Sequence, residues 1–314
     1  MRLRLTILCL TIVSLSSAFA QQIKFAPQWT PQSQFAGYYA AYENGYYEEL
    51  GLDVSFEHPT ASYSSMNMLT DGTVQVVTSE LIQAMMLSDR ECPMVNILQT
   101  TQHSTLILMS RSADVDEFSD LAGKRVGTWK IGFSEIPHMI DQQDSLNIEW
   151  IKLINSLNVY ISGAIDATLA KSYNEHIIFA MSGVTPGSVL KFAEHGFDFP
   201  EDGLFVTEEF YKKNTEACKK FAQASRKGWE WVRKNREAAL DIVMKYVKQG
   251  NVATNRYNQK WMLDIILEVQ EDVKGGPASY YLKQEDFNRL NDALLKYGYI
   301  SRPVVYRRFM GDNK

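Results

Sequence analysis

The sequence predicts an α/β protein built from two lobes. Short segments of alternating apolar residues, such as 23–25 and 52–56, are followed by stretches whose apolar residues recur at helical spacing. This order of strand and helix restarts near Arg111, after an apolar strand and before an acidic loop. The chain has 314 residues, which is long enough for two hydrophobic cores. The expected division is lobe 1 from residues 21–110 and 204–314, and lobe 2 from residues 111–203.

The first 20 residues have the features of a secretion signal peptide. Arg2 and Arg4 precede an apolar stretch, residues 5–16, that is too short to span a bilayer, and residues 18–20 form a small-x-small cleavage site. We expect cleavage before Gln21 and a mature chain in the periplasm. The cysteine of this segment is preceded by bulky apolar residues, so no lipid anchor is predicted.

Composition excludes several classes of function. Without Arg2 and Arg4, 30 basic residues remain against 37 acidic ones, a formal charge of −7 with neutral histidine. No basic patch stands out, which argues against nucleic acid as a partner. No later apolar stretch is long enough for a membrane helix. Cys92 and Cys218 lie far apart in the sequence, and we favour two unpaired thiols.

The first element of lobe 1 joins a strand to an aromatic helix. Trp29, Gln32 and Gln34 lie in the turn between them, which is where open α/β sheets place ligands. Aromatic surface beside a few polar groups is typical of a pocket. The alternative is that Trp29 belongs to the hydrophobic core. The core interpretation is preferred for three nearby tyrosines, Tyr42, Tyr46 and Tyr47.

A second junction lies at Ser79 and Glu80, between a buried strand and a helix. Ser79 is a natural helix cap, and Glu80 suits the positive end of the helix dipole. A hydroxyl and free backbone N–H groups at this position could also hold a ligand oxygen. Capping alone explains the residue types equally well. The remaining elements expected before the lobe boundary are a helix at 62–70, a strand at 74–77, a helix at 81–87, and strands at 94–98 and 105–109.

Lobe 2 begins with a junction that resembles the first one. Trp129 and Phe133 follow a strand directly, and Gly132 allows close approach of a backbone. Ser134 and Pro137 fit the first turn of a helix. The Gly-x-x-x-x-Gly-Lys-Ser/Thr pattern of a phosphate loop is absent.

The triplet Tyr173-Asn174-Glu175 is the main polar motif of lobe 2. Tyr173 can stack on a ring, Asn174 offers a donor and an acceptor, and Glu175 is a strong acceptor. These abilities suit a heteroaromatic amine. A solvated helix start with an acidic first turn is an equally good interpretation.

The rest of the chain is expected to return to lobe 1 and to end in helices. Turn residues from 194 to 203, which include Asp202, mark the return crossing. The remaining expected elements are strands at 148–154, 189–192 and 204–206, and helices at 177–181, 217–232, 237–247, 259–269 and 285–297.

No local motif of catalysis or metal binding is present. The five histidines show no metal-ligand spacing with Cys, Asp or Glu, and there is no Gly-x-Ser-x-Gly elbow or long dinucleotide loop. We therefore expect no metal and no cofactor, and a function in binding rather than turnover.

Several segments together carry a resemblance to a known family. They lie in the same order as in that family at residues 29–37, 45–54, 123–127, 173–175 and 202–206, with 224–229 in addition. The chain resembles the periplasmic substrate-binding proteins of ABC transporters that are related to thiamine-pyrimidine precursor binding. Their superfamily also holds sulfonate and riboflavin binders and the yeast thiamine-pyrimidine synthase.

The resemblance implies a type 2 periplasmic-binding fold, in which two α/β lobes are joined by two crossover strands and the C-terminal helices pack on the first lobe. It implies a monomer that holds a small heteroaromatic ligand in the cleft and delivers it to an ABC permease and its ATPase, which would be its only connection with the membrane. Trp29 would stack on the ring, and Asn174 and Glu175 would bind an aminopyrimidine-like edge. The candidate ligand-binding residues are Trp29, Gln32, Gln34, Tyr38, Ser79, Glu80, Trp129, Gly132, Phe133, Ser134, Tyr173, Asn174, Glu175 and Asp202.

Two alternatives stay open. A synthase of the same superfamily makes the pyrimidine from pyridoxal phosphate and its own histidine, with iron. The cysteine-rich motif of that branch is absent here, and no lysine and histidine pair occupies residues 58–62. A sensor module that signals a bound solute is the other alternative. Pyrimidine binders often show Asn and His where this chain has residues 31–35, so the ligand is not fixed by the resemblance.

Overall fold

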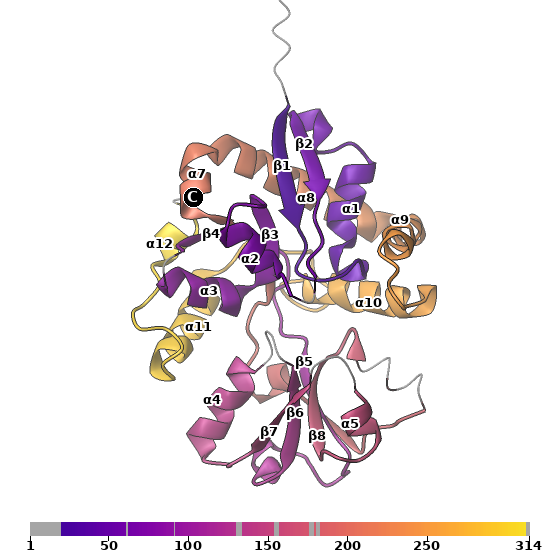
Figure 1. Ribbon diagram of the computed structural model, residues 1–314, viewed down its shortest axis with the longest axis vertical. Coiled ribbons are helices and arrows are strands. Elements are labelled where there is room, and N and C mark those ends of the chain that lie inside the picture. The colour runs from indigo at the N-terminus through magenta and orange to yellow at the C-terminus, as the bar shows by residue number, and fades with distance from the viewer. Residues whose placement is uncertain are drawn as a thin grey trace, which may run out of the picture.

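The computed structural model describes residues 20–60, 62–90, 92–129, 134–153, 157–175, 179 and 183–311. The strands of this part form two five-stranded sheets, and each sheet belongs to a lobe of its own (Figure 1). The predicted α/β architecture of two lobes is confirmed. The signal peptide prediction falls almost entirely on residues 1–19, which lie outside the described residues.

The sheet of lobe 1 has the strand order β2-β1-β3-β10-β4. Strand β1 runs parallel to β2 and β3, whereas β10 runs antiparallel to β3 and β4. Gly51 has φ 75°, a left-handed conformation that suits glycine, and it connects a short 3-10 helix to β2. The strands are β1 (Gln21–Ala26), β2 (Leu52–Phe56), β3 (Val76–Glu80), β4 (Met94–Gln99) and β10 (Asp202–Thr207).

Helices from both ends of the chain cover this sheet. The C-terminal helices pack on lobe 1, as expected, with α8 against α1 and α11 near α3 (Figure 1). The contact of α1 with α8 is close because both helices carry glycine: a Cβ on Gly228 would lie 2.0 Å from the carbonyl oxygen of Gly37. The helices are η1 (Ser33–Phe35), α1 (Ala36–Glu43), η2 (Glu48–Leu50), α2 (Ser65–Thr70), α3 (Leu81–Asp89), α7 (Glu208–Lys213), α8 (Thr215–Lys234), α9 (Arg236–Gln249), α10 (Arg256–Val269), α11 (Gln284–Lys296) and α12 (Tyr306–Phe309).

Lobe 2 has the strand order β7-β6-β8-β5-β9. Strand β6 is parallel to β7 and β8, and β5 is antiparallel to β8 and β9. The elements are β5 (Leu106–Ser110), η3 (Phe118–Leu121), β6 (Arg125–Trp129), α4 (Glu135–Asp144), β7 (Glu149–Leu153), α5 (Asn158–Ile161), β8 (Ala167–Lys171), β9 (Ser188–Lys191) and η4 (Phe192–His195). The helix expected at 177–181 lies outside the described residues except for the buried Phe179.

The chain passes between the lobes at residues 100–105 and 196–201. The boundary predicted near Arg111 is wrong by one strand, because β5 pairs with β8 and β9 and therefore belongs to lobe 2. The second crossing ends where β10 begins, at Asp202 rather than Leu204. The error arises because an apolar strand does not reveal its partners in its own sequence.

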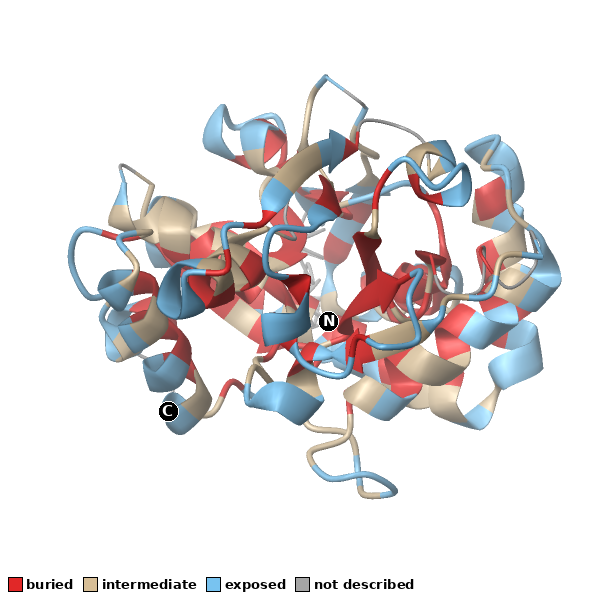
Figure 2. Ribbon diagram, turned by 90° about the horizontal axis from the view of Figure 1, so that it is seen from below, coloured by how far each residue is buried: buried red, intermediate tan, exposed pale blue. Residues whose placement is uncertain are grey.

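Buried residues follow both sheets and the inner faces of the helices, while the outer faces of the helices are exposed (Figure 2). Tyr47 is buried as expected, but Tyr42 is 44% exposed and is not part of the core. Helix α2 begins at Ser65, after the capping residue Ser64, and not at residue 62. Among the helices that the structure describes, none combines the length and the apolar character needed to cross a bilayer.

Candidate functional site

The candidate site lies where strand ends of the two lobes meet the two crossings. The carboxyl ends of β1 and β3 carry Trp29 and Glu80 on the side of lobe 1, and β8 ends at Lys171 in lobe 2. Strand ends of this kind are the usual position of ligands in α/β proteins. The site is therefore built from residues that are far apart in the sequence.

Hydrogen bonds tie the two crossings together. The hydroxyl of Thr101 accepts from the backbone N–H of Asp202 at 2.7 Å, and the backbone N–H of Thr100 donates to the carbonyl of Asp202 at 2.9 Å. The carboxylate of Glu201 accepts from the hydroxyl of Ser104 at 2.8 Å and from the backbone N–H of Thr105 at 2.9 Å. The crossings form one connected hinge.

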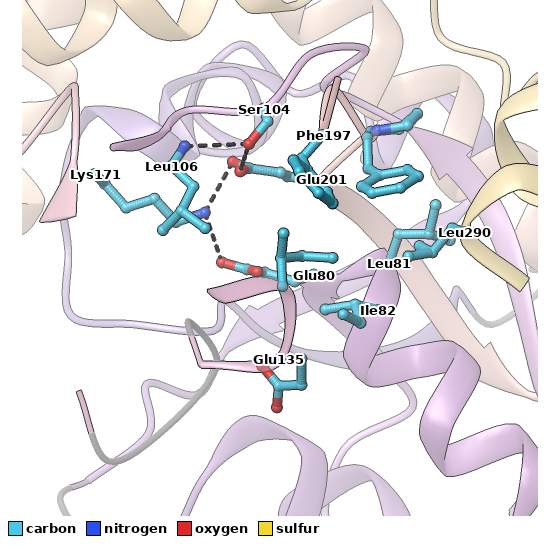
Figure 3. Close-up of a pocket in the computed structure, with 13 residues that line it drawn as sticks. Glu80, Leu81, Ile82, Ser104, Leu106, Glu135, Lys171, Phe197, Glu201 and Leu290 are labelled. Atoms are coloured by element: carbon cyan, nitrogen blue, oxygen red, sulfur yellow. Dashed lines mark hydrogen bonds and ion pairs between the residues drawn. The ribbon is translucent and has the colours of Figure 1, made fainter. Parts of the chain in front are cut away.

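A buried ion cluster lies beside this hinge. Nζ of Lys171 is 3.0 Å from Oε1 of Glu80 and 2.9 Å from Oε2 of Glu201 (Figure 3). The three groups come from lobe 2, from lobe 1 and from the second crossing. Burial alone would lower the pKa of Lys171, but the carboxylates of Glu201 and Glu80 outweigh it and raise the pKa above its ordinary value.

Burial raises the pKa of three carboxyl groups of the site. Burial raises the pKa of Glu80 to about 8, against the lowering effect of Lys171. Burial also raises the pKa of Asp202 and of Glu175. Tyr173 is surrounded by these acids, since burial and then the charges of Asp202, Glu201, Glu80 and Glu175 raise its pKa well above the ordinary value. The cluster contains more acids than one lysine can neutralise.

Two glutamines bind Asp202, and a third binds one of them. Nε2 of Gln28 donates to Oδ1 at 2.9 Å, and Nε2 of Gln34 donates to Oδ2 at 2.5 Å. Gln34 in turn accepts from Gln32 at 2.5 Å. The expected polar residues Gln32, Gln34 and Asp202 are thus brought together, but all three are buried and bonded to one another.

Trp29 and Tyr38 differ in their exposure. The side chain of Trp29 is 54% exposed, so this residue is not part of the core. Its carbonyl accepts from the ring of His58 at 3.1 Å, depending on the tautomer. Tyr38 is fully buried, and its hydroxyl makes no hydrogen bond with any of the described residues. Tyr38 therefore lies behind the site.

The prediction that Ser79 caps the following helix is wrong. Ser79 is still in strand β3, and its hydroxyl donates to the carbonyl of Glu80 at 3.3 Å. Glu80 is the residue that precedes α3, and its side chain makes no capping hydrogen bond. Its carboxylate is directed to Lys171 instead, which explains why a capping rule based on residue type failed.

The lobe 2 junction is described only in part. The indole N–H of Trp129 donates to the carbonyl of Leu169 at 3.2 Å, and the ring packs against the apolar cluster of lobe 2. Ser134 precedes α4, as the sequence predicts, without a side-chain capping bond. Gly132 and Phe133 lie outside the described residues.

The triplet after β8 folds back on its own segment. One oxygen of Glu175 accepts from the backbone N–H of Lys171 at 2.8 Å, and the other accepts from the side chain of Asn174 at 3.2 Å. Tyr173 is buried and belongs to the large apolar cluster of lobe 1. Tyr173 therefore connects the lobes. Glu175 bonds to its own segment, but it is buried and is not the solvated helix start of the alternative interpretation.

A small cavity remains at the hinge. It has a volume of about 40 Å³ and is lined by the ion cluster on one side and by apolar side chains such as Phe197 and Leu290 on the other (Figure 3). This volume holds a few water molecules but is well below the roughly 300 Å³ of a typical ligand pocket. A ring-sized ligand needs more space than this cavity gives. Among the described residues, no group of three or more His, Cys, Asp or Glu is placed to hold a metal ion.

Sequence reasoning missed four residues of this region. Lys171 and Glu201 form the ion cluster, Gln28 binds Asp202, and the indole N–H of Trp261 on α10 lies 3.5 Å from the carbonyl of Ser172 in lobe 2. The position of Lys171 directly after the apolar strand 167–170 could have indicated its role, because a lysine that is buried at the end of a strand needs an acidic partner. Its partners could not be read from the sequence.

Comparison with known proteins defines the class of protein. The chain has the fold of periplasmic binding proteins: the aliphatic sulphonate binding protein SsuA from Escherichia coli superposes with a TM-score of 0.67 over 92% of this chain and 91% of that one, at 12% identity. The family described as NMT1/THI5 like matches residues 32–239, and the chain belongs to this family.

Two curated relatives are also similar in sequence. The formylaminopyrimidine-binding protein of Halalkalibacterium halodurans is 22% identical over 305 residues, which cover 95% of this chain and 92% of the relative. The 4-amino-5-hydroxymethyl-2-methylpyrimidine phosphate synthase THI5 of Saccharomyces cerevisiae is 23% identical over 228 residues, which cover 67% of each chain. The binding protein thus matches a larger share of this chain than the enzyme does.

Proposed function

We propose that this protein is an extracytoplasmic solute receptor of an ABC importer that binds a small heteroaromatic ligand, such as a thiamine pyrimidine precursor, between its lobes. The observation that carries the proposal is an exposed indole, Trp29, that follows the first strand of lobe 1 and comes directly after Gln28, whose side chain binds the buried carboxylate of Asp202. An aromatic surface next to strong acceptors suits a flat base with amine groups. The relative that covers 95% of this chain is named for such a ligand.

Charge also supports a ligand with N–H donors. Burial is the main cause of the raised pKa of Glu80, Glu175 and Asp202, so the charged forms of these acids lack the water and its hydrogen-bond donors that would otherwise stabilise them. A ligand that brings amine groups supplies such donors, whereas an anion adds charge of the same sign. We therefore propose that an amine-bearing ring binds better than a sulphonate.

The complete proposed ligand-binding set is the one predicted from the sequence, with Trp29, Asn174 and Glu175 as direct contacts. Gln32, Gln34 and Asp202 would support it as a bonded group, and Tyr38 would form its apolar base. The proposed partners are a permease and an ATPase, and the proposed location is the periplasm after cleavage before Gln21.

Native mass spectrometry of the protein purified from its host, followed by calorimetry with formylaminopyrimidine and with an aliphatic sulphonate, tests the proposal. We expect a copurified heteroaromatic compound, and micromolar or tighter binding of the pyrimidine. Binding of the sulphonate alone would refute it. Incubation with pyridoxal phosphate and iron is the control for the synthase: a new pyrimidine, with loss of a histidine from the protein, would identify an enzyme.

A further inference from the structure

Lys171 occupies a position between the lobes that no other cation of the described residues shares. It is the last residue of β8, and its side chain is 3% exposed. Its ammonium contacts Glu80 at the end of β3 and Glu201 in the second crossing (Figure 3). One cation therefore connects the sheet of lobe 2 with the sheet of lobe 1 and with the hinge.

The backbone of the same residue holds the candidate ligand acid of lobe 2. The N–H of Lys171 donates to Oε2 of Glu175 at 2.8 Å, and its carbonyl accepts from the N–H of Asn174 at 3.0 Å. Glu80 and Glu175 are the acids that the two lobes bring to the site. Lys171 contacts both of them, one through its ammonium and one through its peptide group.

Burial sets these ion pairs apart from the others. In the pairs of Lys171 with Glu80 and Glu201, each side chain is at most 13% exposed. In every other ion pair between described residues, at least one partner is 20% exposed or more, and exposed pairs contribute little. A lysine separated from both acids would be left as an uncompensated buried charge, so the contacts of Lys171 with Glu80 and Glu201 favour the arrangement in which β3 and β8 are close together.

We propose that Lys171 is a positioning residue that couples closure of the two lobes to assembly of the ligand site, an inference that rests on the proposed function. In the closed arrangement the ammonium holds Glu80 against β8 while the peptide group of Lys171 holds Glu175. When the lobes separate, Glu80 moves away with β3, and a ligand meets only part of the acceptor set. A ligand that binds both acids stabilises the closed arrangement because it interacts better with that state than with the open one.

The test uses three variants and one matched control. Glu80→Ala removes the lobe 1 end of the contact and leaves Lys171 paired with Glu201, so this variant is expected to fold. Lys171→Met removes the cation, and Lys171→Arg restores a charge at the same position. The control is Lys191→Met, which breaks an exposed pair with Glu194 inside lobe 2. Circular dichroism verifies the fold of each protein.

Small-angle X-ray scattering of the empty proteins is the readout that does not depend on a ligand. We expect a larger radius of gyration for Glu80→Ala and Lys171→Met than for the unmodified protein, a value close to the original for Lys171→Arg, and no change for Lys191→Met. Calorimetry with formylaminopyrimidine should show at least about tenfold weaker binding for the first two, since less of the protein is in the closed state.

An unchanged radius of gyration in Glu80→Ala, and in Lys171→Met where that variant folds, overturns the proposal whatever the affinities are. If the unmodified protein does not bind formylaminopyrimidine, the proposed function fails on its own. The scattering of the empty proteins then still decides whether Lys171 holds the lobes together.

Discussion

Replacing Glu80 by glutamine should change how the stability of the protein depends on pH. The carboxyl group of Glu80 faces Lys171, Glu201 and Asp202, and its pKa in the folded protein is about 8, compared with an ordinary value of 4.5. The folded state therefore binds a proton more tightly than the unfolded state does. The stability contributed by this group is fully present below pH 4.5 and is lost as the pH rises through about 8.

The magnitude follows from the width of this interval. One pKa unit corresponds to about 1.36 kcal/mol, so the interval from 4.5 to about 8 gives at most about 5 kcal/mol of unfolding free energy. Lys171 and the neighbouring acids share the titration with Glu80. We therefore expect a loss of at least about 2 kcal/mol between about pH 5 and about pH 8.5 in the unmodified protein.

Urea unfolding followed by circular dichroism at several pH values measures this loss. Glu80→Gln keeps the size of the side chain but cannot ionise, so its stability should fall less over the same range, and it should exceed that of the unmodified protein at the alkaline end. Some slope should remain, because burial raises the pKa of Asp202 and Glu175 as well. Equal slopes in the two proteins, or stability that rises with pH, would refute the reasoning.

Three further substitutions test other parts of the structure. Trp29→Ala should weaken binding of an aromatic ligand by about tenfold in calorimetry, since ring stacking gives about 0.5–1.5 kcal/mol beyond the free energy of burying the ring surface. Because the indole is 54% exposed, the melting temperature of the empty protein should hardly change. A large drop in melting temperature would place Trp29 in the core. Glu175→Gln should weaken ligands with an exocyclic amine by about 1.5–3 kcal/mol relative to amine-free analogues, and equal losses for both would remove this assignment. Gly228→Ala would place a Cβ 2.0 Å from the carbonyl oxygen of Gly37, so thermal unfolding should show a loss of roughly 1–3 kcal/mol, compared with almost none for Lys227→Ala on the exposed side of the same helix.

Most of the fold could be predicted because it depends on local patterns. Alternating apolar residues identified strands such as β1 and β2, and helical spacing identified α8 to α11. The lobe boundary was misplaced because β5 is apolar on both faces, and such a strand can pair in either sheet. The sheet that β5 joins depends on the crossing at residues 100–105. Hydrogen bonds of Thr100 and Thr101 with Asp202 hold this crossing in place.

The candidate site was predictable only where one segment contains the information. The sequence placed Trp29 correctly at an exposed strand end. It assigned Ser79 to a cap that does not form, because Glu80 contacts a lysine 91 positions further along the chain. Lys171 received no role for the same reason. Its importance depends on two acids, Glu80 and Glu201, that the fold alone brings to it.

The fold and the choice of ligand depend on different residues, for a physical reason. The sulphonate-binding protein shares the fold of this chain at 12% identity, so two packed lobes and a hinge tolerate almost complete replacement of the side chains. Ligand choice depends on a few buried charges instead, where one substitution changes the sign of the local potential. Here one ammonium, Lys171, lies among Glu80, Glu201 and Asp202. That surplus of acids is the physical basis of our proposal that a ligand with N–H donors binds better here than an anion does.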